Sequence, residues 1–249
     1  MGGRSHFTRT IMQSVNWRTV FIGVAILGIL VAGPASVTTV TAKAPPEPVC
    51  GVCTSSLDEA ARDHGVSLER GTSSMHIQLD ENGSASFVAT VELVAGAEQL
   101  QDETVRNAIV RDVSYVLVEE REDLQTAIRG NSLIVRYRSQ EVSHVTLGVV
   151  RFDAFQTRDA PPLASGGEGS PYPGADRLTL GAPTGFRLHG AHGDASTETT
   201  IVWHGDSHEQ YAGNIEEDVV ISFVSEDASL PSLRIAMAEL IDWVSSLAH

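Results

Sequence analysis

Two groups of residues in this sequence have types and spacings that could do chemistry, and the first is a pair of cysteines. Cys50 and Cys53 are the only cysteines and form a Cys-x-x-Cys motif. Such a pair can form a disulfide staple, act as a thiol-disulfide redox centre, or supply half of a zinc site. A redox motif usually follows a strand and begins a helix, whereas here a proline-rich stretch precedes the pair and the helix signal begins only at Ser56. The context therefore favours the staple over the metal half-site and the redox centre.

The second group consists of four histidines and one aspartate late in the sequence: His189, His192, His204, Asp206 and His208. Imidazole and carboxylate groups are ligands for zinc and other borderline metals. If the flanking strands formed a hairpin, these side chains would converge at one end of a sheet. They lie in glycine-rich stretches, however, where polar residues are expected in any case, and no His-Glu-x-x-His motif is present. Solvated loops are therefore the favoured interpretation, and a zinc site is the alternative.

Other motifs are few. The sequence has no Gly-x-Ser-x-Gly elbow, no phosphate-binding glycine loop and no dinucleotide fingerprint. Asn82-Gly83-Ser84 matches the N-glycosylation sequon. The Asn-Gly pair is equally typical of a hairpin turn, so Asn82 is a candidate glycosylation site at a predicted turn.

The charges are acidic and unevenly distributed. The chain holds 32 acidic against 17 basic residues, for a net charge of −15. Lys43 is the only lysine, and no acid precedes Glu47. An acidic surface almost without lysine is typical of proteins in concentrated salt, where a Debye length of about 3 Å at 1 M screens self-repulsion; an ordinary acidic protein is the alternative. No basic patch could neutralise phosphates, which excludes nucleic acid as a partner.

An uncharged N-terminal segment predicts a membrane connection. Residues 19–42 carry no charge, residues 20–32 form an apolar run, and three arginines precede them. This order is that of a secretory signal peptide, and if no peptidase cuts it, the segment is long enough to span a bilayer. The arginines would stay in the cytoplasm. Both outcomes place the acidic part outside, as a cell-membrane protein with an extracytoplasmic domain or as a secreted one.

Three helices are expected beyond that segment. A capping box at Ser56 begins a short helix that Gly65 ends. A valine and isoleucine stripe predicts a second helix over residues 102–120, although residues 113–118 alone are equally typical of a strand. The third covers residues 231–248 and is too polar to span a bilayer. It should pack on the sheet, and a helix that lies on a membrane surface is the alternative. Its apolar side comprises Leu233, Met237, Leu240, Ile241, Val244 and Ala248.

The remaining segments predict strands. Alternating apolar residues predict a hairpin in which a three-residue turn with left-handed Gly83 pairs Leu79 with Ala85 and Ile77 with Phe87. A second hairpin turns at Gly130-Asn131. It should pair Ile128 with Leu133, Thr126 with Val135 and Leu124 with Tyr137. Further strands are expected at 145–155, 178–180, 186–188, 201–203 and 219–224, with a surface loop at 161–174.

These elements define the fold class and the domain organisation. We expect an α+β protein, mainly an antiparallel β-sandwich with two or three added helices, plus an N-terminal apolar transmembrane or signal helix. Residues 1–42 form the signal peptide or membrane anchor. Residues 43–56 form a proline-rich linker with the cysteine pair, residues 57–229 the extracytoplasmic β-rich domain, and residues 230–249 the C-terminal amphipathic helix.

Four short motifs carry a resemblance to a known group of proteins. They are Cys50-Gly-Val-Cys53, Leu79-Asp-Glu-Asn-Gly83-Ser-Ala-Ser-Phe87, Ala175-Asp-Arg-Leu-Thr-Leu-Gly-Ala-Pro183-Thr-Gly185 and the late Trp203. Their order resembles uncharacterised haloarchaeal secreted or membrane-anchored proteins. The resemblance covers roughly residues 48–226 and implies a salt-adapted surface protein without implying any activity.

The expected function is a non-enzymatic extracytoplasmic cell-surface interaction or structural module. Its expected partners are the membrane, through the N-terminal segment, and a cell-surface protein or glycan. A metal-binding protein or metal-dependent enzyme that uses the histidine group is the first alternative. A thiol-disulfide protein that uses Cys50 and Cys53 is the second.

Overall fold

The computed structural model describes residues 47–113, 121–140, 142–155, 171–209, 211–216 and 219–246. All of them belong to residues 41–249, the second of the two units into which the chain divides. The predicted signal or anchor segment lies outside the described residues. Within them, no helix is long and apolar enough to cross a membrane.

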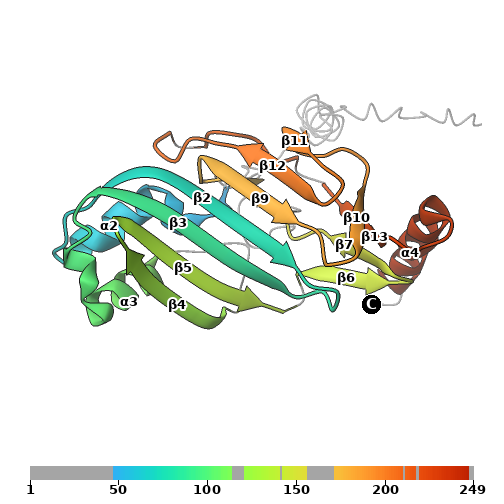
Figure 1. Cartoon of the computed structure of the whole chain (residues 1–249), viewed down its shortest axis with the longest axis horizontal. Helices are drawn as coiled ribbons and strands as arrows, with labels where there is room; N and C mark the ends of the chain where they lie inside the picture. Colours follow the sequence, from blue (N-terminus) through green and yellow to red (C-terminus); the bar gives the residue numbers. More distant parts are fainter. Residues whose placement is uncertain are drawn as a thin grey trace, which may run out of the picture. The chain divides into compact units, whose positions relative to one another are not determined.

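The described residues form an α+β fold that is mostly sheet with three α-helices, as expected. The main sheet has the order β11 (Ala195–Ser196), β12 (Thr200–His204), β9 (Arg177–Gly181), β2 (Glu69–Leu79), β3 (Ala85–Ala95), β5 (Ser132–Ser139) and β4 (Glu122–Arg129). The second sheet has the order β10 (Phe186–His189), β13 (Ile221–Ser225), β7 (Val149–Phe152) and β6 (Ser143–Thr146) (Figure 1). The helices are α2 (Ser55–Asp63), α3 (Glu103–Asp112) and α4 (Pro231–Ser246).

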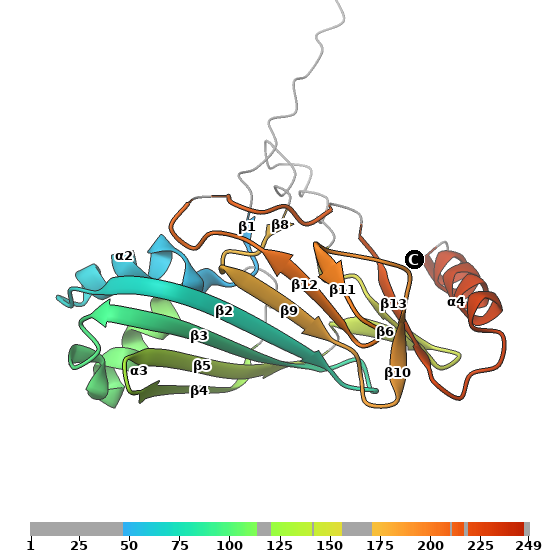
Figure 2. The same cartoon turned by 45° about the horizontal axis from the view of Figure 1, so that its top comes forward.

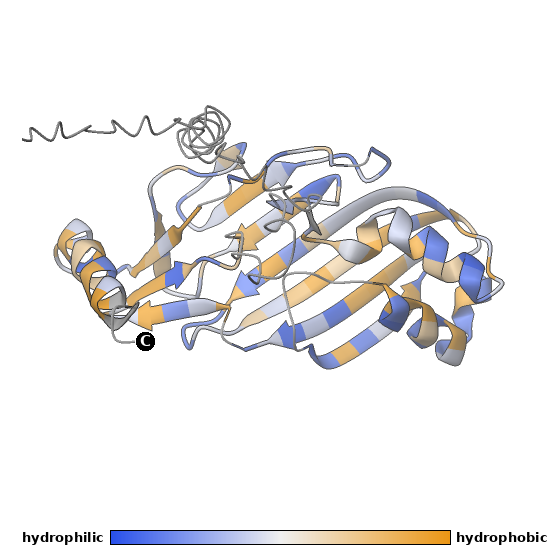
Figure 3. Ribbon diagram, turned by 180° about the vertical axis from the view of Figure 1, so that it is seen from behind, coloured by the Kyte–Doolittle hydropathy of each residue, from blue (hydrophilic) through white to orange (hydrophobic). Residues whose placement is uncertain are grey.

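The main sheet has one apolar face and one polar face because its side chains alternate with period two. Along β3 the buried residues are Ala85, Phe87, Ala89, Val91 and Leu93. Helices α2 and α3 cover this face at one end of the sheet (Figure 3). The sheet is mainly antiparallel, as expected, and the one parallel pair among its described strands is β2 with β9.

The first predicted hairpin is confirmed in register. Leu79 pairs with Ala85 and Ile77 with Phe87. Asp80 donates its N–H to the Ser84 carbonyl, which leaves three residues in the turn, and Gly83 has φ +90°. The hydrophobic pattern therefore identified both the loop length and the left-handed glycine.

The second hairpin is confirmed at its turn and corrected farther away. Ile128 pairs with Leu133 and Thr126 with Val135, as expected. The register shifts between Glu122 and Gln125, where Asp123 has φ +53°. The expected pairing of Leu124 with Tyr137 is therefore wrong, because an extra residue bulges out of β4.

The single strand expected at residues 145–155 is also wrong. The chain reverses at Leu147 and Gly148, which both have positive φ angles, and so forms the hairpin of β6 and β7. Two consecutive left-handed residues are the signature of a tight two-residue hairpin turn. Leu147 carries no glycine-like signal in its side chain, so the apolar run masked the turn.

Helices α2 and α3 begin close to where their sequence signals lie. Thr54, and not Ser56, caps α2: its hydroxyl accepts the Ser56 N–H at 3.3 Å. Gly65 follows the helix with φ +73°, as expected. Helix α3 is capped by Asp102 and ends at Asp112, well before the expected residue 120, and residues 114–120 lie outside the described residues.

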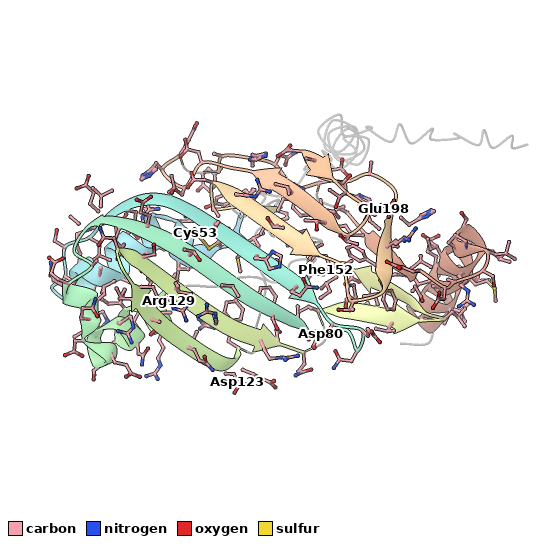
Figure 4. The ribbon with its side chains drawn as sticks, viewed as in Figure 1. Cys53, Asp80, Asp123, Arg129, Phe152 and Glu198 are labelled. Carbon is pink, nitrogen blue, oxygen red and sulfur yellow. A yellow bond between two sulfur atoms is a disulfide. The ribbon has the colours of Figure 1, made fainter. Side chains whose placement is uncertain are left out.

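The second sheet separates the main core from α4. Phe152 lies on β7 of this sheet (Figure 4). Its ring meets that of Phe155 edge-on at a centroid distance of 4.7 Å, and Phe155 contacts Trp203 of the main sheet in the same way at 5.5 Å. On the outer side of the second sheet, Val149 and Val224 form a small cluster with two residues of α4. The second sheet therefore has apolar contacts on both faces.

Helix α4 packs through a face other than the one predicted. Its contacts with the sheet are made by Ile235 and Ala238. The expected packing side is exposed instead, and comprises Leu233, Met237, Leu240, Ile241 and Val244; Ala248 lies outside the described residues. The apolar contacts of α4 with the sheet are therefore made by its smaller apolar side, and the larger apolar stripe faces outward.

The folded unit begins earlier than the predicted boundary at residue 57. β1 (Glu47–Pro48) pairs in parallel with β8 (Pro171–Tyr172), and Val49 and Val52 belong to the main core. Residues 47–56 are therefore part of the fold and not of a linker. Most of the loop expected at 161–174 lies outside the described residues.

Gly83 provides a test of how the first hairpin joins the second sheet. Its carbonyl accepts the N–H groups of Val142 and Ser143, and a Cβ added to it would lie 2.6 Å from the Ser143 carbonyl oxygen. Gly130→Ala is the matched control, because Gly130 has φ +60° and nothing within 4 Å of an added Cβ. Both changes should cost about 1–2 kcal/mol for the left-handed backbone.

Gly83→Ala should cost clearly more than this control in urea unfolding, because the backbone of residues 142 and 143 must also move. Equal losses would contradict the tie between the hairpin tip and β6.

Candidate functional site

A polar cleft of about 320 Å³ lies beside the start of α2, at the lower end of the volumes typical of ligand sites. Its walls come from β1, the first turn of α2, β8 and the loop after β12. The side chains that line it include Thr54, Glu59, Tyr172, Asp206, His208 and Tyr211. The site therefore combines segments that are far apart in the sequence.

The disulfide lies directly behind this cleft. Cys50 and Cys53 are joined, with their Cα atoms 5.3 Å apart, and both are completely buried. The Cys50 N–H donates to the Pro173 carbonyl at 3.1 Å, so the bridged turn, η1 (Gly51–Cys53), is anchored to the segment after β8. Reactive cysteines lie in accessible surroundings, and this burial indicates a structural staple.

Arg70 connects the disulfide turn to the rest of the site. Its Nε donates to Asp58 Oδ2 at 2.8 Å, and its Nη1 donates to the Cys53 carbonyl at 2.5 Å and the Ser207 carbonyl at 3.0 Å. The Arg70 side chain is 4% exposed and that of Asp58 27%. A buried guanidinium needs such a set of acceptors, because an unpaired charge in the interior is strongly unfavourable.

Asp176 holds the same loop from the other side. Its carboxylate accepts hydrogen bonds from the N–H and hydroxyl groups of both Ser73 and Ser207, at 2.6–3.1 Å. Burial alone would raise the pKa of Asp176, but these hydrogen bonds outweigh it, and the pKa is lowered. Ser207 thus accepts from Arg70 and donates to Asp176, which links the buried guanidinium to the partly buried carboxylate through one residue.

Tyr172 and Tyr211 form the aromatic part of the cleft. Their rings meet edge-on at a centroid distance of 5.5 Å. Burial, together with the neighbouring Tyr211, raises the pKa of Tyr172, so its hydroxyl stays protonated. Phenol hydroxyls can donate hydrogen bonds, and the carboxylates of Glu59, Asp206 and Glu209 can accept them. This is chemistry for reversible binding of a ligand that is rich in hydroxyl or amide groups.

The structure does not gather the predicted metal ligands. His189 ends β10, which pairs with β13, whereas His204 ends β12 in the main sheet, so the expected hairpin between these strands does not form. Of the five predicted residues, only Asp206 and His208 line the cleft. His192 lies in the segment before β11.

Contacts with the backbone explain the positions of the Asp206 and His208 side chains. Asp206 Oδ1 accepts the His208 and Glu209 N–H groups, and His208 Nε2 lies 3.2 Å from the Gly71 carbonyl. In the part of the chain that the structure describes, no group of three or more His, Cys, Asp or Glu residues could hold a metal ion. Zinc binding therefore stays a prediction that has no support from this arrangement.

The glycosylation candidate lies at the tip of the first hairpin. Asn82 is exposed, and its Oδ1 accepts the Ser84 N–H at 3.1 Å and the Ser84 hydroxyl at 2.8 Å. These contacts stabilise the turn, which is one of the two explanations for the Asn-Gly pair. Glycosylation of Asn82 stays a prediction.

Sequence reasoning missed Arg70, Asp176 and both tyrosines. Period two places Ser73, Met75 and Ile77 on the buried face of β2, which would turn Arg70 outward. A register shift between Arg70 and Ser73 turns it inward. Gly71 was the available signal, since a glycine inside a strand often marks a bulge. Nothing local could indicate the contact of Asp176 with Ser73, because the two residues are 103 positions apart.

The burial of the disulfide predicts its reactivity. Neither Cys50 nor Cys53 should react with iodoacetamide in the native protein, with or without a mild reductant, because both are oxidised and inaccessible. Both should react after unfolding in the presence of a reductant, as mass spectrometry would detect. Rapid labelling of the folded protein by reductant and iodoacetamide would instead indicate an accessible, redox-active pair.

Arg70→Met should destabilise the fold by about 3 kcal/mol in urea unfolding, because it leaves Asp58 and two carbonyls without their donor. Arg138→Met is the matched control. Arg138 pairs with Asp80 at 2.6 Å, but both side chains are at least 40% exposed, so this change should cost less than about 1 kcal/mol. Similar costs for the two variants would show that the buried network is not stabilising.

The hydrogen bonds to Asp176 predict that part of the unfolding free energy is lost in acid. Its lowered pKa means that its contribution is fully present above the unfolded value of about 3.9 and is lost as the pH falls through the folded value. The unfolding free energy of Asp176→Asn should therefore be below that of the wild type by a constant amount from pH 7 to about pH 5. The difference between the two free energies should shrink in stronger acid. Ser73→Ala should remove part of the contribution of Asp176, because it removes one of the hydroxyl donors to the carboxylate. A difference that stays constant down to about pH 2 would contradict this role.

Comparison with known proteins does not assign this chain to a family. No protein-family model matches the chain, and no curated protein matches it. What the protein does therefore has to follow from the chemistry of its own residues.

Proposed function

We propose that this protein is a non-enzymatic extracytoplasmic module of the cell surface, adapted to concentrated salt, that binds or supports other surface molecules. The observation that carries the proposal is the completely buried Cys50–Cys53 disulfide at the head of the folded unit. Disulfides persist in oxidising compartments outside the cytoplasm. Because the Cys53 carbonyl also holds Arg70, the bridge is built into the network that organises the cleft.

The N-terminal segment supports the extracytoplasmic location. Residues 20–32 are apolar, and the folded unit begins at Glu47. If the whole uncharged segment, residues 19–42, is retained in the membrane, the four residues 43–46 link it to β1, a length of about 14 Å when extended. The proposed module is therefore held close to the membrane, or released if a peptidase cuts the segment.

We infer that the module is a β-sandwich of the two sheets. Support comes from the apolar contacts of Phe152, Phe155 and Trp203, which connect the second sheet to the main one. Residues of both sheets also belong to a single apolar core. A rigid body of this kind suits a structural or binding role at a surface, because its cleft is lined from several fixed elements.

The excess of acidic residues and the weakness of the surface ion pairs support salt adaptation. The net charge is −15 and only one lysine is present, as in the haloarchaeal surface proteins that the motifs resemble. Ion pairs at the surface, such as Arg187 with Glu226 at 3.6 Å, contribute little. Concentrated salt therefore removes little attraction while it screens the repulsion among the many carboxylates.

The partner that suits the cleft is a cell-surface protein or glycan. The exposed ring of Tyr211, packed against the buried Tyr172, offers apolar surface, and the exposed Glu59 and Asp206 offer carboxylate acceptors. Hydroxyl-rich and amide-rich ligands are bound by such mixed polar and aromatic walls. Because the acceptors are carboxylates, a strongly acidic partner is disfavoured.

The proposal predicts that residues 43–249 become more stable as salt rises. Their thermal midpoint should climb between dilute and multimolar KCl, because screening removes repulsion that favours the expanded chain. At low salt the midpoint should also rise as the pH falls from 7 toward the sequence pI of about 4.9, since protonation removes part of the same charge.

The pH measurement distinguishes screening of charge repulsion from a general strengthening of apolar burial by salt. A thermal midpoint that does not change with KCl would contradict adaptation through the acidic surface. A midpoint that rises with KCl but does not rise in mild acid would contradict it as well.

A further inference from the structure

Helix α4 presents an apolar stripe to the outside of the fold. Leu233, Met237, Leu240 and Val244 are 55%, 47%, 59% and 53% exposed. They follow one side of the helix, which lies at the outer edge of the second sheet (Figure 2). Four large apolar side chains in one row are more than the scattered exposure that is normal for a protein surface.

The spacing of the stripe indicates another helix as its partner. The four residues are separated by four, three and four positions, and Leu247 continues the series in the sequence. Apolar residues that alternate three and four apart are the a and d positions of a two-helix coiled coil, whose seam they form. Each such residue inserts between four residues of the facing helix. A pattern of this kind is complementary to itself.

The helix is already held in the position from which it could dimerise. Its opposite side contacts the second sheet through Ile235 and Ala238. Near its start, Arg234 donates to the Leu147 carbonyl at 3.0 Å and to the Ser229 carbonyl at 3.2 Å. Association therefore does not have to form the helix, which lowers the entropic cost of binding.

Charge identifies a second copy as a fitting occupant. The protein carries a net charge of −15, so most of its surface repels another copy. The stripe has no acidic residue, and the coiled-coil flanking positions hold Arg234, Ala236, Ile241 and Trp243. Two copies that meet along it would bring no carboxylates of the seam face to face. A membrane surface fits less well, because interfacial helices usually carry several lysines or arginines and anionic headgroups repel an acidic protein.

We propose that α4 is a homodimerisation helix, whose stripe packs against the same stripe of a second copy. The same patch on both copies forms the contact, as in most symmetric dimers. The dimer would place two clefts on one assembly. This proposal goes beyond the proposed function and does not depend on it, since it rests on α4 alone.

Disulfide cross-linking of the full-length chain tests the proposal. Leu240→Cys places a thiol at the centre of the stripe, where it approaches its counterpart in a parallel or an antiparallel pair. Glu239→Cys is the matched control on the same helix, because Glu239 is exposed but lies off the stripe. Cys50 and Cys53 do not interfere, since both are buried in their own disulfide.

Mild oxidation should convert most of the Leu240→Cys chain to a dimer on a non-reducing gel, with at least about tenfold less for Glu239→Cys. Adding Leu233→Glu and Val244→Glu to Leu240→Cys should lower the dimer band by a similar factor, because four carboxylates would then face one another. Resistance of the native disulfide to alkylation would show that these variants are folded.

Three results would overturn the proposal. Equal dimer bands for the two cysteine variants would mean random collision. A Leu240→Cys thiol that forms no dimer but reacts with a water-soluble maleimide would mean that the stripe faces solvent. A thiol that forms no dimer and is also protected from the maleimide would mean that lipid or another molecule covers it.

Discussion

The buried guanidinium of Arg70 is the constraint on which the site depends. Because it cannot lose its charge, it needs acceptors wherever it is enclosed. It takes them from Asp58 of α2, Cys53 of the disulfide turn and Ser207 of the loop after β12. Asp176 then holds Ser207 from the opposite side. The buried Arg70 and the partly buried Asp176, which carry opposite charges, thus fix the elements that form the cleft, and the disulfide restricts the turn that supplies one acceptor.

Local patterns predicted much of the fold. Alternation with period two determined the registers of both hairpin turns, and the α+β class followed from the number of strands. The failures have local causes as well: Leu147 takes the first left-handed position of a turn whose only glycine is Gly148, and the bulge at Asp123 shifts the register of β4. A single residue inserted into or turned out of a strand changes which side chains face the core, and the sequence pattern does not specify where this occurs.

The site was less accessible to prediction than the fold. The cysteine pair was identified because its motif is contiguous. Asp206 and His208 were predicted as metal ligands, and the structure places them in the wall of a cleft. Arg70 and Asp176 act through partners more than 100 positions away, which no local pattern reveals. Helix α4 shows a related limit. Its apolar stripe was correctly identified, but amphipathicity does not tell whether that stripe faces its own sheet or the outside.

The central claim is that Arg70 and Asp176 stabilise the fold as one unit through Ser207. A double-mutant cycle with Arg70→Met and Asp176→Asn tests it most directly, because the two side chains share Ser207 as a hydrogen-bond partner. The account predicts that the double variant loses less unfolding free energy than the sum of the single losses, with a coupling above about 0.5 kcal/mol. Single losses that add to within about 0.3 kcal/mol would contradict it.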